Sequence, residues 1–172
     1  MRLFKPIFVL ILVTATPLSA PSAKMAINSD PPVNVFLNAI VTWLSSNFEL
    51  PAIYKHPVIE LMPANQISDI RYKTIAPKQR REVIAIYDDN SRKIVLSENW
   101  AGNSAVELSV LVHEMVHHLQ NMANLNYECA AAREELAYAA QAKWLKLFGS
   151  NLHRALEIDQ LTLKLATTCM LR

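Results

Sequence analysis

Apolar residues recur every three or four positions over much of the chain, a spacing that predicts α-helices. The clearest patterns cover residues 33–48, 105–123, 127–148 and 151–170, and a shorter one covers 64–72. Pro51 ends the first helix, because proline cannot continue the backbone hydrogen-bond ladder. Gly149 follows residue 148, at the position where helices commonly end in a glycine. The last pattern is rich in leucine, so we expect that helix to pack on the core.

Three short runs are rich in β-branched residues instead, at 58–62, 82–87 and 93–96. The polar sequence Asp88-Asp89-Asn90-Ser91 separates the last two runs, and this arrangement is typical of a hairpin. The fold class that we predict is therefore α+β. We expect one mostly helical domain with a small β-hairpin or sheet before the helix at 105–123.

The first residues have the order of a secretory signal peptide. A short basic start at 1–5 precedes an apolar run at 6–13, and residues 14–23 are rich in small residues and proline. The apolar run is shorter than the roughly 20 residues that span a bilayer. We expect a signal peptide at 1–23, cleaved somewhere between residues 20 and 26, and a single domain at 24–172. The alternative is that the segment is retained as a membrane helix; otherwise the chain is exported, to the periplasm or beyond, with no stable membrane span.

Charge excludes one class of partner. The formal charge is +2, and cleavage after residue 23 would remove two of the 17 basic residues and none of the 15 acidic ones. The mature chain would then be neutral, without the basic excess that a nucleic-acid surface needs. Apolar residues make up 52% of the sequence, enough for a buried core.

Two cysteines, Cys129 and Cys169, are present. In an exported chain an even pair predicts a disulfide, here between the region after the helix at 105–123 and the C-terminus. The alternative is a pair of buried free thiols.

Two histidines stand four residues apart in His113-Glu114-Met115-Val116-His117. On a helix these positions share one face, so both imidazoles can bind one metal ion. Glu114 is rotated by about 100° around the helix, which suits it to hold a water beside the ion. This is the HExxH arrangement, in which the glutamate is the general base. The alternative is that both histidines are merely packed or lie on the surface.

A catalytic zinc ion takes three protein ligands and keeps one position open. The downstream candidates for the third ligand are Glu128, Glu134, Glu135 and His153. The helix side that carries Glu134 also carries Ala137, Tyr138 and Gln141 and has little other apolar bulk. Small residues there would let another helix approach closely, as a shared ion requires.

The sequence His113-Glu114-x-x-His117, followed by Glu134-x-x-Ala137-Tyr138, resembles the gluzincin metallopeptidases, the thermolysin-like group. The resemblance covers about residues 105–144. It implies a zincin-like domain with Zn²⁺ bound by His113, His117 and a glutamate of the next long helix, which by this match is Glu134. Glu135 and Glu128 stay open as alternatives.

The chain departs from that group at Tyr138, where an aspartate often stands and orients a ligating histidine. The tyrosine hydroxyl could take this orienting role or stabilise the oxyanion, for which Tyr127 and His118 are further candidates. We expect His118 to point away from the metal, since it lies about 100° from His117 on the helix. With Tyr138, Gln120 and Cys129, the chain is more similar to small exported bacterial proteins known mainly by their HExxH motif.

These observations predict a zinc-dependent hydrolase, within that class a peptidase, which acts on a peptide or protein with Glu114 as general base. The hairpin resembles the strand that holds extended substrates in that group, and we expect its strand at 93–96 to pair with a peptide. One alternative is a non-catalytic zinc-binding protein of the cell envelope. Its site would be closed by a fourth ligand such as His118, His153 or Glu128. The other alternative is an interaction module without metal.

Overall fold

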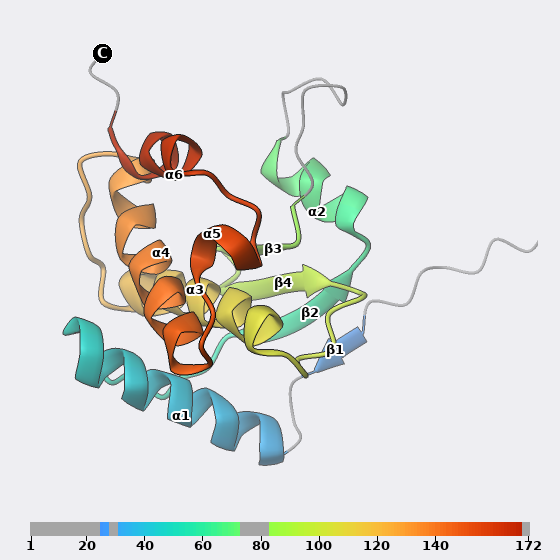
Figure 1. Cartoon of the computed structure of the whole chain (residues 1–172). Helices are drawn as coiled ribbons and strands as arrows, with labels where there is room; N and C mark the ends of the chain where they lie inside the picture. Colours follow the sequence, from blue (N-terminus) through green and yellow to red (C-terminus); the bar gives the residue numbers. More distant parts are fainter. Residues whose placement is uncertain (1–24, 28–30, 73–82, 170–172) are drawn as a thin grey trace, which may run out of the picture.

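The computed structural model describes residues 25–27, 31–72 and 83–169 (Figure 1). The predicted signal peptide at 1–23 lies outside the described residues, as does the start of the strand predicted at 82–87. Within the described part, no helix has the length and apolar character needed to cross a membrane.

A four-stranded sheet runs through the domain. Its strands are β1 (Met25–Ile27), β2 (Val58–Met62), β3 (Ala85–Asp88) and β4 (Lys93–Ser97). Their order is β1-β2-β4-β3; β2 and β4 are parallel, and the other neighbours are antiparallel. The predicted hairpin is confirmed as β3 and β4. Asp88 closes its turn by accepting hydrogen bonds from the backbone N–H of Asn90 and the hydroxyl of Ser91.

Helices cover both faces of this sheet (Figure 1). Side chains alternate between the two faces along each strand, so neighbouring strand residues pack against different helices. Ile94 and Leu96 point into the larger core, which they share with three helices: α1 (Pro31–Phe48), α3 (Ala105–Met122) and α4 (Ala130–Leu147). Val95 points to the other face and packs against Ile67 of α2 (Ala64–Arg71). The fold is therefore the mostly helical α+β domain that the sequence predicts.

A capping box starts α3, the helix that carries the HExxH sequence. The Ser104 hydroxyl accepts from the backbone N–H of Glu107, and the Glu107 carboxylate accepts from the backbone N–H groups of Ala101 and Asn103. Backbone donors at the helix start are thereby satisfied. From Ser109 to Gln120 every residue is buried. The histidines of the motif therefore lie inside the protein, not on its surface.

The start of α4 differs from the prediction by three residues. The sequence predicts a helix from residue 127, whereas α4 begins at Ala130, because the preceding Cys129 has extended backbone, with φ −156°. The end of α4 is as predicted, since Gly149 follows it with φ +70°.

The single C-terminal helix predicted at 151–170 is wrong. The segment forms two short helices, α5 (Leu152–Ala155) and α6 (Gln160–Thr167). Glu157 separates them with φ +51°, and the Asp159 side chain then caps α6 by accepting from the N–H of Thr162. The expected core packing is also wrong for α6, which has no buried side chain and leaves Leu161 67% exposed.

The predicted disulfide is present between Cys129 and Cys169. It joins the residue before α4 to the segment after α6, so the first turn of α4 is covalently fixed. A disulfide of this kind is typical of proteins in oxidising compartments, as expected for an exported chain.

Candidate metal centre

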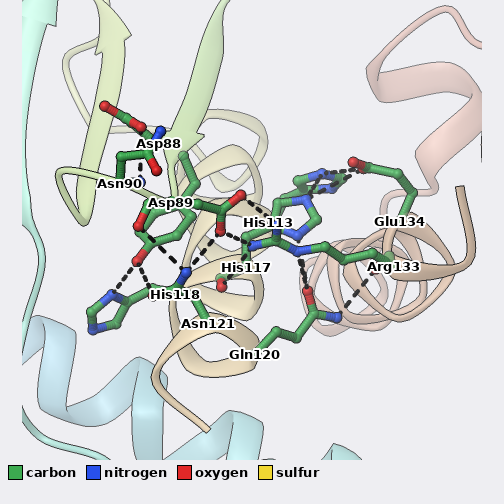
Figure 2. Close-up of polar contacts among 11 residues, drawn as sticks. Asp88, Asp89, Asn90, His113, His117, His118, Gln120, Asn121, Arg133 and Glu134 are labelled. Carbon is green, nitrogen blue, oxygen red and sulfur yellow. Dashed lines mark hydrogen bonds and ion pairs between the residues drawn. The ribbon is translucent and has the colours of Figure 1, made fainter. Parts of the chain in front are cut away.

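Three side chains converge between α3 and α4 (Figure 2). His113 and His117 come from α3, and Glu134 comes from the second turn of α4. The His113 Nε2 atom lies 3.2 Å from the Glu134 Oε2 atom and 3.2 Å from the His117 Nε2 atom. The His117 Nε2 atom lies 3.3 Å from the same Glu134 oxygen. These are the three residues that the sequence predicts as metal ligands, and the group could hold a metal ion.

The spacing of the three atoms fits a tetrahedral ion. Bonds of about 2.0–2.1 Å in tetrahedral geometry place ligand atoms about 3.3–3.4 Å apart. The three separations, 3.2, 3.2 and 3.3 Å, are close to that value. One ion can therefore reach all three atoms.

The neutral His113 ring carries its proton on Nδ1, the nitrogen that faces away from Glu134. Gln141 fixes it: the Gln141 Nε2 atom donates to the Ser109 hydroxyl, which in turn donates to the carbonyl of Val106. The amide oxygen of Gln141 is therefore the atom that faces His113 Nδ1, at 3.1 Å. Since an oxygen can only accept, Nδ1 carries the proton and Nε2 presents a lone pair.

His117 is held in the same tautomer by a different glutamine. Gln120 donates from Nε2 to the carbonyl of Arg133, and its Oε1 atom accepts from the Arg133 Nε atom. This oxygen also lies 3.0 Å from His117 Nδ1, so Nδ1 is again the donor. In their neutral forms both imidazoles thus direct Nε2 lone pairs toward the Glu134 oxygen.

Three electron-rich atoms in a buried place require a positive charge between them. The pKa values report the same requirement in the absence of a metal. Burial alone would lower the pKa of His117, but the hydrogen bond to Glu134 and the charges of Glu114 and Glu134 outweigh it and raise this pKa. Burial would raise the pKa of Glu134, but contact with His113 and His117 holds it far below its usual value.

Small residues on α4 allow the two helices to approach. Ala137 and Ala140 are fully buried against the core that includes α3. Glu134, Ala137 and Gln141 stand three or four residues apart, so they share one face of α4. The alanine-rich face predicted from the sequence is therefore the face that carries Glu134, the third member of the group.

Glu114 and Tyr138, the predicted catalytic residues, border the group. Glu114 is only 6% exposed, and its charge helps to raise the pKa values of His117 and Tyr138. The Tyr138 ring packs edge-on against the His113 ring, with centroids 4.7 Å apart. Burial, followed by the charges of Glu134 and Glu114, raises the pKa of Tyr138, so its hydroxyl keeps its proton.

The orienting hydrogen bond that the sequence suggested for Tyr138 comes from another residue. Gln141, not the tyrosine hydroxyl, receives the Nδ1 proton of His113. Tyr138 constrains His113 through ring contact instead. Its second predicted role, stabilising the oxyanion, stays a prediction.

The other candidates lie elsewhere. Glu128 and Glu135 are exposed, and His153 is exposed on α5, where it bonds the carbonyl of Ile158. His118 is buried and points away from the group, as predicted. Its Nε2 atom donates to the carbonyl of Lys55 and its Nδ1 atom lies 3.3 Å from the Tyr87 hydroxyl. Among the residues that the structure describes, the metal group therefore has three members and no fourth protein ligand.

The strand predicted to pair with a peptide is not at the edge of the sheet. β4, which contains the predicted range 93–96, pairs with β2 on one side and β3 on the other. Within the described residues the edge strands are β1 and β3, and of these β3 is the one that packs against α3. The N–H of Ser97 bonds the carbonyl of Ile84, so by antiparallel alternation the backbone groups of Ala85 and Tyr87 point outward.

Sequence reasoning gave no role to Gln120 or Gln141, although their side chains contact the two candidate histidine ligands. Their positions carry a usable signal: Gln120 is three residues after His117, and Gln141 is seven after Glu134. Both spacings return to the same helix face.

The chain belongs to the family described as "Domain of unknown function (DUF6647)", whose match covers residues 30–172. That range contains the three candidate ligands, both glutamines and both cysteines. Comparisons with curated proteins and with solved structures gave no match.

Proposed function

We propose that this protein is a zinc-dependent hydrolase that cleaves peptide bonds. The observation that carries the proposal is the convergence of two imidazole nitrogens and one carboxylate oxygen, each within 3.3 Å of the others. On the outer side, the Nδ1–H groups of the two imidazoles donate hydrogen bonds to the amide oxygens of Gln141 and Gln120. Such a group has the donors, the tautomers and the spacing that a metal ion needs.

The donor set and its motif favour zinc. Two histidines and one carboxylate form a known catalytic zinc set, but they also bind iron(II). Here the two histidines stand four residues apart on one helix with Glu114 between them, the HExxH arrangement that is typical of zinc peptidases.

An open site argues for catalysis and against a purely structural metal. Structural zinc sites are closed by four protein ligands, whereas catalytic sites have three. The candidates for a fourth ligand, His118, His153 and Glu128, are held or exposed elsewhere. Zinc in this site would supply Lewis acidity, which lowers the pKa of a bound water and polarises a carbonyl group.

Glu114 is the residue suited to move the proton. It follows His113 directly on α3, is buried, and lies close enough for its charge to act on His117 and Tyr138. As general base, its carboxylate would take the proton from the attacking water and pass it to the leaving amine. The protonated Tyr138 hydroxyl would serve as a donor to the oxyanion.

The edge strand β3 supplies a place for an extended peptide. β3 packs against α3, and the Tyr87 hydroxyl lies beside His118 of that helix. Outward backbone groups at Ala85 and Tyr87 could pair with a peptide that lies along α3. This replaces the prediction that placed the peptide on residues 93–96.

The experiment that tests this function replaces Glu114 by Gln. The zinc-loaded wild type and the variant are incubated with a library of denatured peptides, and new termini are identified by mass spectrometry. We expect the variant to keep one zinc per chain and to lose roughly 100-fold or more of the cleavage rate. Glu135→Gln, an exposed neighbour of the third ligand, is the control and should cleave normally. Equal cleavage by Glu114→Gln, or no cleavage by the zinc-loaded wild type, would overturn the proposal.

A further inference from the structure

A continuous chain of hydrogen bonds links the β3–β4 turn to the metal group (Figure 2). It runs from Asp89 in the turn through Arg133 on α4 and Gln120 on α3 to His117. Asp89 and Arg133 are 44 residues apart in the sequence. The chain therefore joins three elements: the turn and both helices that carry ligands.

Arg133 lies at the centre of this chain, and hydrogen bonds to three different residues fix the position of its guanidinium group. Its Nη1 and Nη2 atoms donate to the two Asp89 oxygens at 2.6 and 2.7 Å. Its Nε atom donates to Gln120 Oε1, and Nη2 also donates to the carbonyl of His117, both at 3.1 Å. A planar guanidinium can make these contacts together, whereas a lysine ammonium offers only one point of attachment.

The contact between Arg133 and Gln120 decides which end of the amide faces His117. The guanidinium can only donate, so it attracts the amide oxygen and leaves the amide nitrogen to the carbonyl of Arg133. If the amide turned over, its N–H₂ group would face His117 Nδ1. That nitrogen would then have to accept, and the ring proton would move to Nε2.

We propose that Arg133, braced by Asp89, is a positioning residue of the metal centre. It keeps the Gln120 oxygen toward His117 and thereby keeps the His117 Nε2 lone pair available to the metal. The inference rests on the metal-binding part of the proposed function and adds its control by a residue that is not a ligand. Arg133 directly precedes the ligand Glu134, so the same ion pair also fixes that turn of α4.

The linkage is reciprocal by thermodynamic necessity. If the turn holds the metal group, metal binding must also hold the turn. Asn121 strengthens this connection, because its Nδ2 atom donates to an Asp89 side-chain oxygen at 3.1 Å. Zinc should therefore slow amide hydrogen exchange at residues 88–92, the turn that contains Asp89.

The test compares Arg133→Met, Arg133→Lys and Asp89→Asn with the wild type. Zinc affinity is measured by competition with a chelator, and thermal unfolding is followed on the metal-free proteins. The matched control is Glu60→Gln, which removes the 2.7 Å ion pair between Glu60 and Lys93 in the same sheet. We expect Arg133→Met to weaken zinc binding by roughly 10–100-fold, as losses of outer-sphere partners do.

Arg133→Lys should lose most of the same affinity although it keeps the charge, Asp89→Asn should lose less, and Glu60→Gln should bind as the wild type does. A purely structural ion pair would instead lower the unfolding temperature and leave zinc affinity unchanged. Affinities of both Arg133 variants within about twofold of the wild type would overturn the inference, since outer-sphere losses are larger.

A second measurement does not depend on zinc. Nitrogen-15 shifts of the His117 ring in the metal-free protein report which nitrogen carries the proton. Measured above the raised pKa of His117, where the ring is neutral, the wild type should show Nδ1 protonated, and Arg133→Met should shift the population toward Nε2–H. An unchanged tautomer would overturn the inference. A wild type that binds no zinc but shows this shift would refute the proposed function and leave the positioning role supported.

Discussion

The Nε2 atoms of His113 and His117 lie 3.2 Å apart, and when both rings are neutral and protonated at Nδ1, neither has a proton to offer the other. On its opposite side each ring donates a hydrogen bond from Nδ1 to a glutamine oxygen, that of Gln141 for His113 and that of Gln120 for His117. Two facing lone pairs beside a carboxylate are unfavourable unless a cation lies between them. This relationship distinguishes the site from an ordinary pair of packed histidines.

The third ligand can be tested against its neighbour. Glu134→Gln removes the charge that both imidazoles contact, whereas Glu135→Gln changes an exposed residue at the next position. We expect Glu134→Gln to weaken zinc binding by more than about 100-fold, beyond the usual loss for an outer-sphere partner. Glu135→Gln should bind as the wild type does. Chelator competition measures both, and equal affinities would assign the third ligand elsewhere.

Gln141 offers a test of the hydrogen bond behind His113. Gln141→Leu removes the acceptor for the Nδ1 proton, whereas Gln141→Glu keeps an oxygen there. We expect the leucine variant to lose roughly 10–100-fold in zinc affinity and the glutamate variant to lose little, since carboxylates commonly hold ligating histidines. If both variants lost affinity equally, packing at this 2% exposed position would be the cause instead.

Local chemistry made much of the site predictable from the sequence. The four-residue spacing of His113 and His117 places both on one helix face, and alanines around Glu134 indicate the facing helix. The hairpin and the cysteine pair are similarly readable, because turn residues and an even cysteine count are local or compositional signals.

Features that depend on distant partners were not predictable. Arg133 meets Asp89 only because the sheet brings the β3–β4 turn beside α4. The inner position of β4 depends on its pairing with β2, more than 30 residues away. Glu157 adopts φ +51°, a conformation that residues other than glycine rarely take. A glutamate at this position therefore does not predict the break between α5 and α6.

The Asp89–Arg133 ion pair should appear in the pH dependence of stability. The hydrogen bond from Arg133 lowers the pKa of Asp89 below 3.8, its value in an unfolded chain. A depressed carboxyl pKa contributes stability that is present above the unfolded value and is lost as the pH falls toward the folded value. The difference between metal-free wild type and Asp89→Asn in urea unfolding should therefore be largest above about pH 5 and should shrink as the pH falls below 3.8. A difference that does not change with pH would contradict this account.

The disulfide should contribute strongly to stability. Cys129 and Cys169 are 40 residues apart, and closing a loop of this length stabilises by about 4 kcal/mol in the chain-entropy model. Reduction should lower the free energy of unfolding by an amount of that order, measured with urea. The double variant Cys129→Ser, Cys169→Ser is the control, because it should not respond to the reductant. A loss below about 1 kcal/mol would show that the reduced chain is held by other contacts.

The most direct test of the central claim is the metal itself. The purified chain is stripped, reloaded with zinc and examined by elemental analysis and X-ray absorption. We expect one zinc per chain with two imidazole nitrogens and a carboxylate oxygen at about 2.0–2.1 Å and one further donor from solvent, and no bound zinc in His113→Ala. A wild type that retains no zinc, or a His113→Ala variant that retains it fully, would contradict the assignment of His113, His117 and Glu134 as a metal centre.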